Sequence, residues 1–173
     1  MGWSRSSTTP LIIILGRIFF LTVPFLLFLT KAKSIDISAT GGWSEIVNET
    51  DLASGAGSDL VATYESSVNA TSMSISNTLD ENDNWRLDVR RVDSGGWHGN
   101  FTLSVRRTSD GNGPGSVSGG LSYIEITTMD SQFFSGAGNR AAIDLQYQLT
   151  GMSVSVSPSN YSTTIVFTIV DIP

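Results

Sequence analysis

The chain has 173 residues, with 10 lysines and arginines against 16 aspartates and glutamates, a formal net charge of −6 and no cysteine. This acidity argues against DNA, RNA or anionic membrane surfaces as partners, because phosphate contacts need clustered cations. The lack of cysteine excludes a disulfide framework, so the 139 residues after position 34 must form a domain that stands on its hydrophobic core alone.

Residues 1–34 have the pattern of a signal peptide. Arg5 and Arg17 carry the only charges before an apolar stretch of signal-peptide length over residues 18–30. Ala32 and Ser34 then supply small residues at the two positions that a signal peptidase reads. Cleavage after Ser34 would leave residues 35–173 as a single secreted domain.

An uncleaved N-terminal membrane anchor is the alternative interpretation of the same segment. Residues 11–30 are long enough to span a bilayer, although they contain Arg17 and Pro24. In either case residues 35–173 lie outside the cytoplasm, and any membrane contact is made only through this hydrophobic leader. The expected location is therefore extracellular or on the cell surface.

Nine stretches after the leader are predicted to form β-strands. Several alternate apolar and polar residues, which places one set of side chains in a core and the other in water. Glycine-rich and Asx turn signals separate them, and no stretch shows a sustained helical period. The expected strands are 35–39, 43–47, 59–66, 72–79, 85–93, 101–108, 121–128, 141–157 (divided or bent at Gly151) and 163–170. This pattern predicts an all-β fold, an antiparallel β-sandwich of about eight to nine strands, immunoglobulin-like or fimbrial-like.

Two of these stretches resemble each other and carry most of the arginines. Residues 85–91 (WRLDVRR) and 101–107 (FTLSVRR) align at an offset of sixteen, which predicts neighbouring strands of one hairpin. Arg90 and Arg106 on this hairpin are candidate ligands for a sulfated or phosphorylated polymer. The alternative is that the arginines pair with carboxylates, which the formal charge of −10 over residues 35–173 favours.

No catalytic site is predicted, and the chain is expected not to be an enzyme. His98 is the one histidine, lysine is lacking after the leader, and no Gly-x-Ser-x-Gly motif occurs. The oxygen-rich run over residues 80–84 could hold a structural calcium through Asp80, Asn82 and Asp83, since Ca²⁺ prefers hard oxygen donors. The alternative is a polar turn whose side chains cap the backbone, with no cofactor bound.

Four aromatic residues lie beside glycine or serine in expected loops. They are Trp43, Trp97, Phe133 and Phe134. Their rings could stack on sugars or on a partner protein, and Trp43 and Trp97 are the candidate ligand-binding residues among them. The alternative is that these rings fold back and close the ends of the core.

The C-terminal run Tyr161-Ser-Thr-Thr-Ile-Val-Phe-Thr-Ile169 resembles the closing strand of WxL-type bacterial surface domains. Trp85-Arg86-Leu87 is similar to the first Trp-x-Leu motif of that family, while Phe167 and Ile169 replace the tryptophan and leucine of the second. The closing strand also resembles the last strand of fimbrial and coat-type subunits. The resemblance implies a surface-located, non-enzymatic β-sandwich.

The sequence thus predicts a secreted or cell-surface structural or adhesive protein, associated with the cell wall or forming a filament. Its partners would be a cell-wall polymer, a glycan or other copies of itself. If it assembles by strand addition, residues 35–47 are the expected donor, because an unpaired terminal strand can complete the edge of a neighbour. The alternative is a carbohydrate-binding module, with or without a structural calcium.

Overall fold

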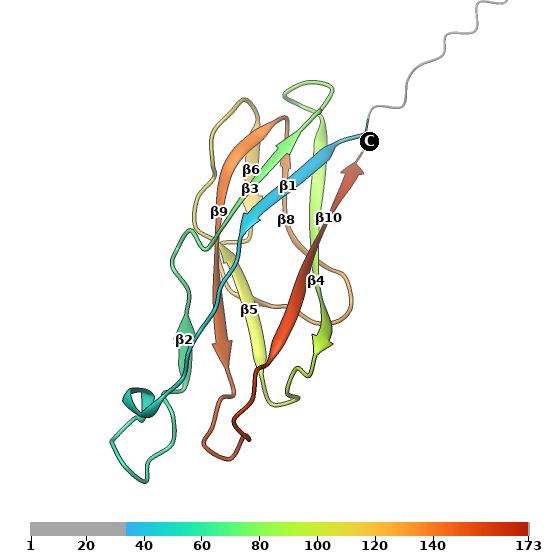
Figure 1. Cartoon of the computed structure of the whole chain (residues 1–173). Coiled ribbons are helices and arrows are strands. Elements are labelled where there is room, and N and C mark those ends of the chain that lie inside the picture. The colour runs from blue at the N-terminus through green and yellow to red at the C-terminus, as the bar shows by residue number, and fades with distance from the viewer. Residues whose placement is uncertain (1–33, 173) are drawn as a thin grey trace, which may run out of the picture. The chain divides into compact units, whose positions relative to one another are not determined.

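Two antiparallel sheets pack face to face, which confirms the all-β sandwich expected from the sequence. The computed structural model describes residues 34–172, and Figure 1 shows its strands. The strands are β1 (Asp36–Gly41), β2 (Thr63–Glu65), β3 (Thr71–Ser76), β4 (Asn84–Gly95), β5 (Thr102–Arg107), β6 (Ser116–Gly119), β7 (Ile124–Glu125), β8 (Ser131–Ala137), β9 (Arg140–Thr150) and β10 (Ser162–Ile172), with a short 3-10 helix, η1 (Glu49–Asp51).

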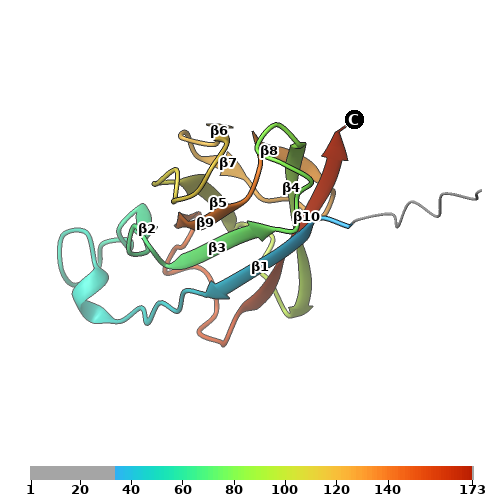
Figure 2. The same ribbon diagram turned by 90° about the horizontal axis from the view of Figure 1, so that it is seen from above.

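One sheet has the strand order β1-β3-β9-β5-β7, and the other has the order β10-β4-β8-β6. The view from above in Figure 2 shows β1, β3 and β9 on one side of the sandwich and β10, β4 and β8 on the other. β9 is long enough to pair with β3 along its first half and with the short β2 along its second half. β9 ends at Thr150, directly before Gly151, as the sequence predicts for the eighth strand.

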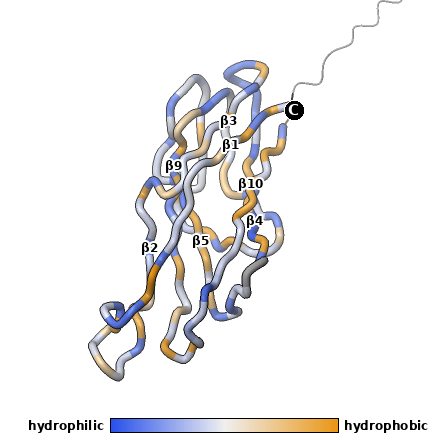
Figure 3. Tube along the Cα trace, viewed as in Figure 1, coloured by the Kyte–Doolittle hydropathy of each residue, from blue (hydrophilic) through white to orange (hydrophobic). Residues whose placement is uncertain are grey.

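The core forms between the apolar faces of the period-two strands. Trp85 and Leu87 of β4 and Val105 of β5 are fully buried, and the Trp85 ring meets Phe134 edge on at 6.0 Å between centroids. Hydrophobic residues recur along β4, β5 and β10 in Figure 3, as alternation requires. This packing stabilises the domain without the disulfides that many small exported domains use.

The predicted hairpin of the two arginine strands is wrong. β4 pairs with β10 and β8, whereas β5 pairs with β9 and β7 in the opposite sheet. The alternation in residues 85–91 and 101–107 correctly marks two core strands, but a period of two says nothing about which strand lies next to which. The connection over residues 96–101 crosses from one sheet to the other instead of turning back.

Several predicted strand boundaries also need correction. Residues 43–47 form no strand, residues 59–66 contain only β2, and residues 121–128 contain only β7. β6 and β8 were not predicted. Phe133 and Phe134 are buried in β8, because the register shifts opposite Leu87 and Asp88 and turns both rings inward. Their expected place in a loop is therefore wrong.

The N-terminal segment is not an unpaired donor strand in this structure. Asp36–Gly41 pairs with β3 of its own chain, from Asp36 opposite Ser76 to Gly41 opposite Thr71. The predicted export signal or membrane anchor over residues 1–34 lies, except for Ser34, outside the described residues. Within residues 34–172, no helix is long and apolar enough to cross a bilayer.

Candidate functional site

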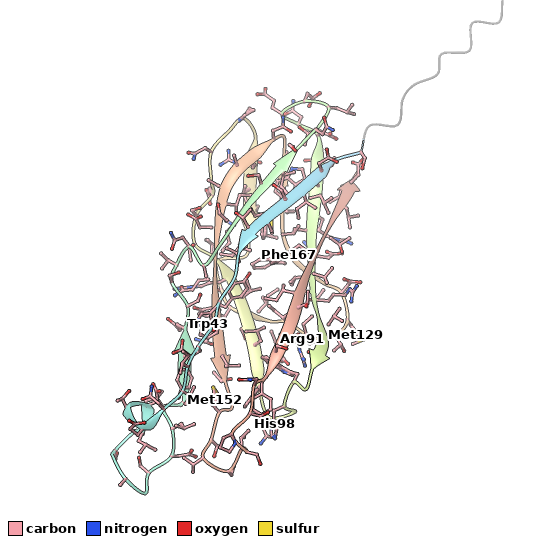
Figure 4. All side chains as sticks on the ribbon, in the orientation of Figure 1. Trp43, Arg91, His98, Met129, Met152 and Phe167 are labelled. Atoms are coloured by element: carbon pink, nitrogen blue, oxygen red, sulfur yellow. The ribbon has the colours of Figure 1, made fainter. Side chains whose placement is uncertain are left out.

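A groove opens between β1 and β10 at one end of the sandwich. It has a volume of about 1150 Å³ and is bounded by residues 39–49, the lower half of β10 and the β9–β10 loop over residues 151–161. Its floor comes from the inner face of β5 and β9. Figure 4 shows Trp43, Met152 and Phe167 on three different segments around this opening. The groove-lining residues used below are Trp43, Trp97, Phe101, Tyr147, Met152 and Phe167.

The groove exists because β1 leaves its sheet at Gly41. The backbone there has φ +109°, and a Cβ on Gly41 would lie 2.3 Å from the carbonyl oxygen of Ala70, so only glycine fits. The backbone N–H of Gly42 still donates to the carbonyl oxygen of Ala70 at 2.8 Å. Residues 43–48 then form an irregular segment, called the lip below, along one side of the groove. After Gly41, no strand of residues 34–172 covers the seam between β10 and the opposite sheet, so the inner faces of the two sheets are reached from outside.

The two candidate tryptophans line this same groove. The indole N–H of Trp43 donates to the Oε2 atom of Glu45 at 3.2 Å, which fixes its ring on the lip. The indole N–H of Trp97 donates to the carbonyl oxygen of Phe101 at 3.3 Å, and the two rings meet edge on at 5.6 Å. Both tryptophans are partly buried against the core, so each closes the core on one side and leaves ring surface in the groove.

A cluster of aromatic rings closes the lower end of the groove. Phe101 and Tyr161 meet edge on at 5.0 Å between ring centroids, and the His98 ring lies 5.2 Å from Phe101. The Nδ1 atom of His98 accepts the backbone N–H of Asn100 at 3.2 Å. His98 therefore packs within a loop against the rings of Phe101 and Tyr161.

Asp59 anchors the β9–β10 loop, which forms one wall of the groove, through hydrogen bonds. Its Oδ1 atom accepts the backbone N–H groups of Val154 at 2.9 Å and Leu60 at 2.8 Å, and its Oδ2 atom accepts the Ser153 hydroxyl at 3.1 Å. The Val154 and Leu60 N–H groups lower the pKa of Asp59, since they stabilise the charged carboxylate. Sequence reasoning missed this residue, because nothing local distinguishes it from other exposed aspartates.

The candidate arginines do not come together. Arg90 lies in β4 with its Nε atom 3.4 Å from Asp130, in a half-exposed ion pair. Arg106 lies in β5, donates to Oε1 of Gln146 at 2.7 and 3.0 Å, and stacks over the Tyr123 ring at 4.8 Å. Because the two strands belong to opposite sheets, these side chains form no shared anion site.

The most buried arginines hold the structure together instead. Arg107 donates to the carbonyl oxygen of Gly119 at 2.9 and 3.0 Å and pairs with Asp110. Arg140 donates to the carbonyl oxygens of Asp110, Gly111, Gly113 and Gly115, in the turn-rich segment before β6. Both guanidinium groups thus hold the backbone of neighbouring turns through several carbonyl acceptors at once.

The candidate calcium residues act as turn-forming side chains. Oδ1 of Asp80 accepts the backbone N–H of Asn82 at 2.7 Å, and Oδ2 of Asp83 accepts the N–H of Leu79 at 2.6 Å. Across residues 34–172, no group of three or more histidine, cysteine, aspartate or glutamate side chains could hold a metal ion. Calcium binding at this turn remains a prediction, with the Asx turn as its alternative.

Comparisons with known proteins add no identification. No protein-family model, no curated protein and no solved structure matches this chain. The likeness to WxL-type domains therefore stays a prediction, and the case for function rests on the groove and on the edges of the sheets.

Proposed function

We propose that this chain is an exported, non-enzymatic β-sandwich that serves as a structural or adhesive protein at the cell surface and holds an extended partner in the groove. The observation that carries the proposal is the open seam between β1 and β10. There, aromatic and aliphatic side chains of the core face an opening of about 1150 Å³.

The shape of the groove suits an extended partner. Ser162–Ile165 and Phe167 of β10 line it, along a stretch of about 17 Å at 3.4 Å per residue. The free side of β10 offers backbone N–H and C=O groups to an added strand, while Phe167 and Met152 offer apolar surface to its side chains. The acidic surface disfavours nucleic acids and favours neutral or cationic partners.

The test compares two methionines of the same chain, both labelled in Figure 4. Met152→Asp places a charge in the groove, whereas Met129→Asp places the same charge on an exposed side chain outside it. We expect residues 35–173 to co-sediment with cell-envelope material of the producing organism. Met152→Asp should abolish this binding and Met129→Asp should keep it. Equal binding by both variants, or no binding by the parent protein, would contradict the proposal.

Binding of a neutral carbohydrate is the second candidate, because the groove brings Trp43 and Trp97 together with polar residues such as Glu45 and Asn160. Aromatic rings beside carboxylate and amide groups can stack on sugar rings and accept or donate to their hydroxyls. On an array of neutral glycans, Trp43→Ala should lose binding and Trp43→Phe should keep most of it. An array without hits, or unchanged binding by Trp43→Ala, would remove this candidate.

Export is tested at the N-terminus of the protein purified from its producing cells. Cleavage after Ser34 predicts a first residue of Ile35 in the secreted protein. A membrane-bound protein that retains residues 1–34 would favour the anchor over the signal peptide. Recovery of the protein in the cytoplasm would overturn both.

A further inference from the structure

We propose that two copies of this chain pair through the free side of β10, antiparallel and about a two-fold axis, so that two four-stranded sheets join into one. The inference rests on the proposed structural role and names its partner, a second copy of the chain. It is carried by the length, composition and accessibility of this one edge strand.

β10 differs from every other edge in the described part of the chain. It has 11 residues, whereas the other edge strands have six (β1), three (β2), four (β6) and two (β7). Edge strands are usually protected by shortness, lysine, proline or a covering element. β10 contains no lysine or proline, and its single charge, Asp171, lies near its end.

Both faces of β10 are apolar enough to be buried by a neighbour. Ile165, Phe167 and Ile169 pack against the core, so the period of two places Val166 and Val170 on the opposite face. The run from Thr163 to Val170 has no charge and consists of threonine, isoleucine, valine and phenylalanine. These residue types favour strands and edge-to-edge pairing.

The free side of β10 also leaves backbone groups without a strand partner. All its strand pairing in the described residues is to β4, from Ser162 opposite Gly95 to Ile172 opposite Asn84. In an antiparallel strand about half of the backbone N–H and C=O groups point to each side. Roughly five groups of each kind lie on this side of β10, and those outside the part that β1 approaches can pair with an added strand.

A second copy is the partner that these features select. Because each copy carries a formal charge of −10, the partner must present a long unpaired strand that is itself uncharged, and within residues 34–172 β10 is the edge strand with an uncharged run from Thr163 to Val170. Antiparallel pairing places the two Asp171 side chains at opposite ends of the interface. With full overlap they are about 27 Å apart at 3.4 Å per residue, well beyond the screening length in physiological salt. A two-fold axis makes this contact closed and self-complementary.

The first test measures association of residues 32–173, which form one compact unit. Analytical ultracentrifugation should show a concentration-dependent dimer. The double variant Val166→Lys/Thr168→Lys places charges on the outward face of the edge and should weaken the dimer at least about tenfold. The control is Gln132→Lys, an exposed position of the interior strand β8, which should leave association unchanged. A parent protein that is monomeric at every concentration, or a double variant that still dimerises, overturns the proposal.

The second test uses the lack of native cysteine, which makes any engineered thiol unique. Single cysteines are placed at Thr164, Val166 and Thr168, and the variants are oxidised alone and in mixed pairs. Two-fold antiparallel pairing brings one position opposite itself or one pair of positions opposite each other, so one combination should dominate. Equal and low cross-linking in all combinations would contradict strand pairing even if the protein dimerised by another surface.

The proposed binding in the groove and the proposed pairing through β10 can be contradicted independently of each other. A monomeric protein that binds envelope material and loses this binding with Met152→Asp overturns the β10 pairing and leaves the adhesive groove standing. A β10-linked dimer whose parent form binds no envelope material overturns the groove's role and leaves the self-association intact.

Discussion

Asp59 and Val154 lie 95 residues apart in the chain, yet the Oδ1 atom of Asp59 accepts the backbone N–H of Val154 at 2.9 Å. The same carboxylate accepts the Ser153 hydroxyl, so one exposed aspartate connects the segment before β2 to the loop before β10. This loop forms a wall of the groove. The contact therefore sets the shape of the groove more than the stability of the core.

Replacing Asp59 with alanine should loosen that wall without unfolding the domain. The backbone N–H groups of Val154 and Leu60 lose their acceptor, and both should exchange with solvent several-fold faster in a hydrogen-exchange measurement. Glu81→Ala, at an exposed carboxylate of the β3–β4 turn, is the control and should leave both rates unchanged. Unchanged exchange in Asp59→Ala would show that the loop is held by other contacts.

The same contact should depend on pH. Two hydrogen bonds hold the pKa of Asp59 below its usual 3.8 in the folded protein. The larger effect comes from the N–H of Val154 and the smaller from the N–H of Leu60. Because the folded pKa lies below the unfolded one, the stabilisation is complete above pH 4 or so and is lost as pH falls through the folded value. An NMR titration of the Asp59 carboxyl group should therefore give a midpoint below 3.8, with Val154 exchange rising in the same range. A midpoint at or above 3.8 would contradict this prediction.

The strands and their buried faces could be predicted where alternation is regular. Trp85 and Leu87 in β4 and Val105 in β5 are buried as the period of two requires. β8 was missed because Phe133 and Phe134 are consecutive and both buried, which breaks that period at a register shift. Sheet order was not predictable, because β4 lies beside β10, whose residues come about 80 positions later.

The groove could not be predicted from the sequence. Trp43 and Trp97 were each predicted as binding residues, but only the topology brings them to one opening. Met152 and Phe167 line the same groove and carry no chemical signal in the sequence. The sequence does mark Arg90 and Arg106 as candidates for one shared anion site. That prediction is wrong, because the two similar strands that carry them, β4 and β5, belong to opposite sheets.

Removing divalent metal should leave the stability of residues 35–173 unchanged. The carboxylates of Asp80 and Asp83 already accept backbone N–H groups of their own turn, at 2.7 and 2.6 Å. A chelator should therefore shift Tm by less than about 1 °C, and excess calcium should not raise it, since only ligands of the folded state stabilise it. A calcium-dependent rise in Tm that is lost in Asp80→Ala would instead establish the structural ion.

Replacing Arg140 should cost far more than replacing Arg90. Arg140 is buried and donates to four backbone carbonyls, so Arg140→Met leaves several of them unsatisfied and should cost about 2–4 kcal/mol of unfolding free energy. Arg140→Lys should recover only part of this loss, because its ammonium group keeps the charge but cannot reach all four carbonyl acceptors. Arg90→Lys keeps the charge of an exposed ion pair and should cost less than about 0.5 kcal/mol. Urea unfolding monitored by tryptophan fluorescence measures all three, and equal losses at both positions would contradict the assignment.

Trp85 and Gly136 lie opposite each other in β4 and β8 and should be coupled energetically. A Cβ on Gly136 would lie 2.4 Å from the carbonyl oxygen of Ser116 and 2.5 Å from the Cζ2 atom of Trp85, so Gly136→Ala overpacks this site and should cost about 1–3 kcal/mol. Trp85→Phe removes ring volume and the hydrogen bond from the indole to Gly138, at a cost of about 2–4 kcal/mol.

The double variant Trp85→Phe/Gly136→Ala should lose less than the two single variants together, because the smaller ring relieves the contact with position 85, whereas the contact with the Ser116 carbonyl oxygen remains. We expect a coupling of about 0.5–2 kcal/mol in a double-mutant cycle measured by urea unfolding. Gly99→Ala is the control, since a Cβ there meets no atom within 4 Å, and it should change stability by less than about 0.5 kcal/mol. Strict additivity would contradict the coupling and show that the cost of Gly136→Ala comes from the Ser116 carbonyl oxygen and not from the Trp85 ring.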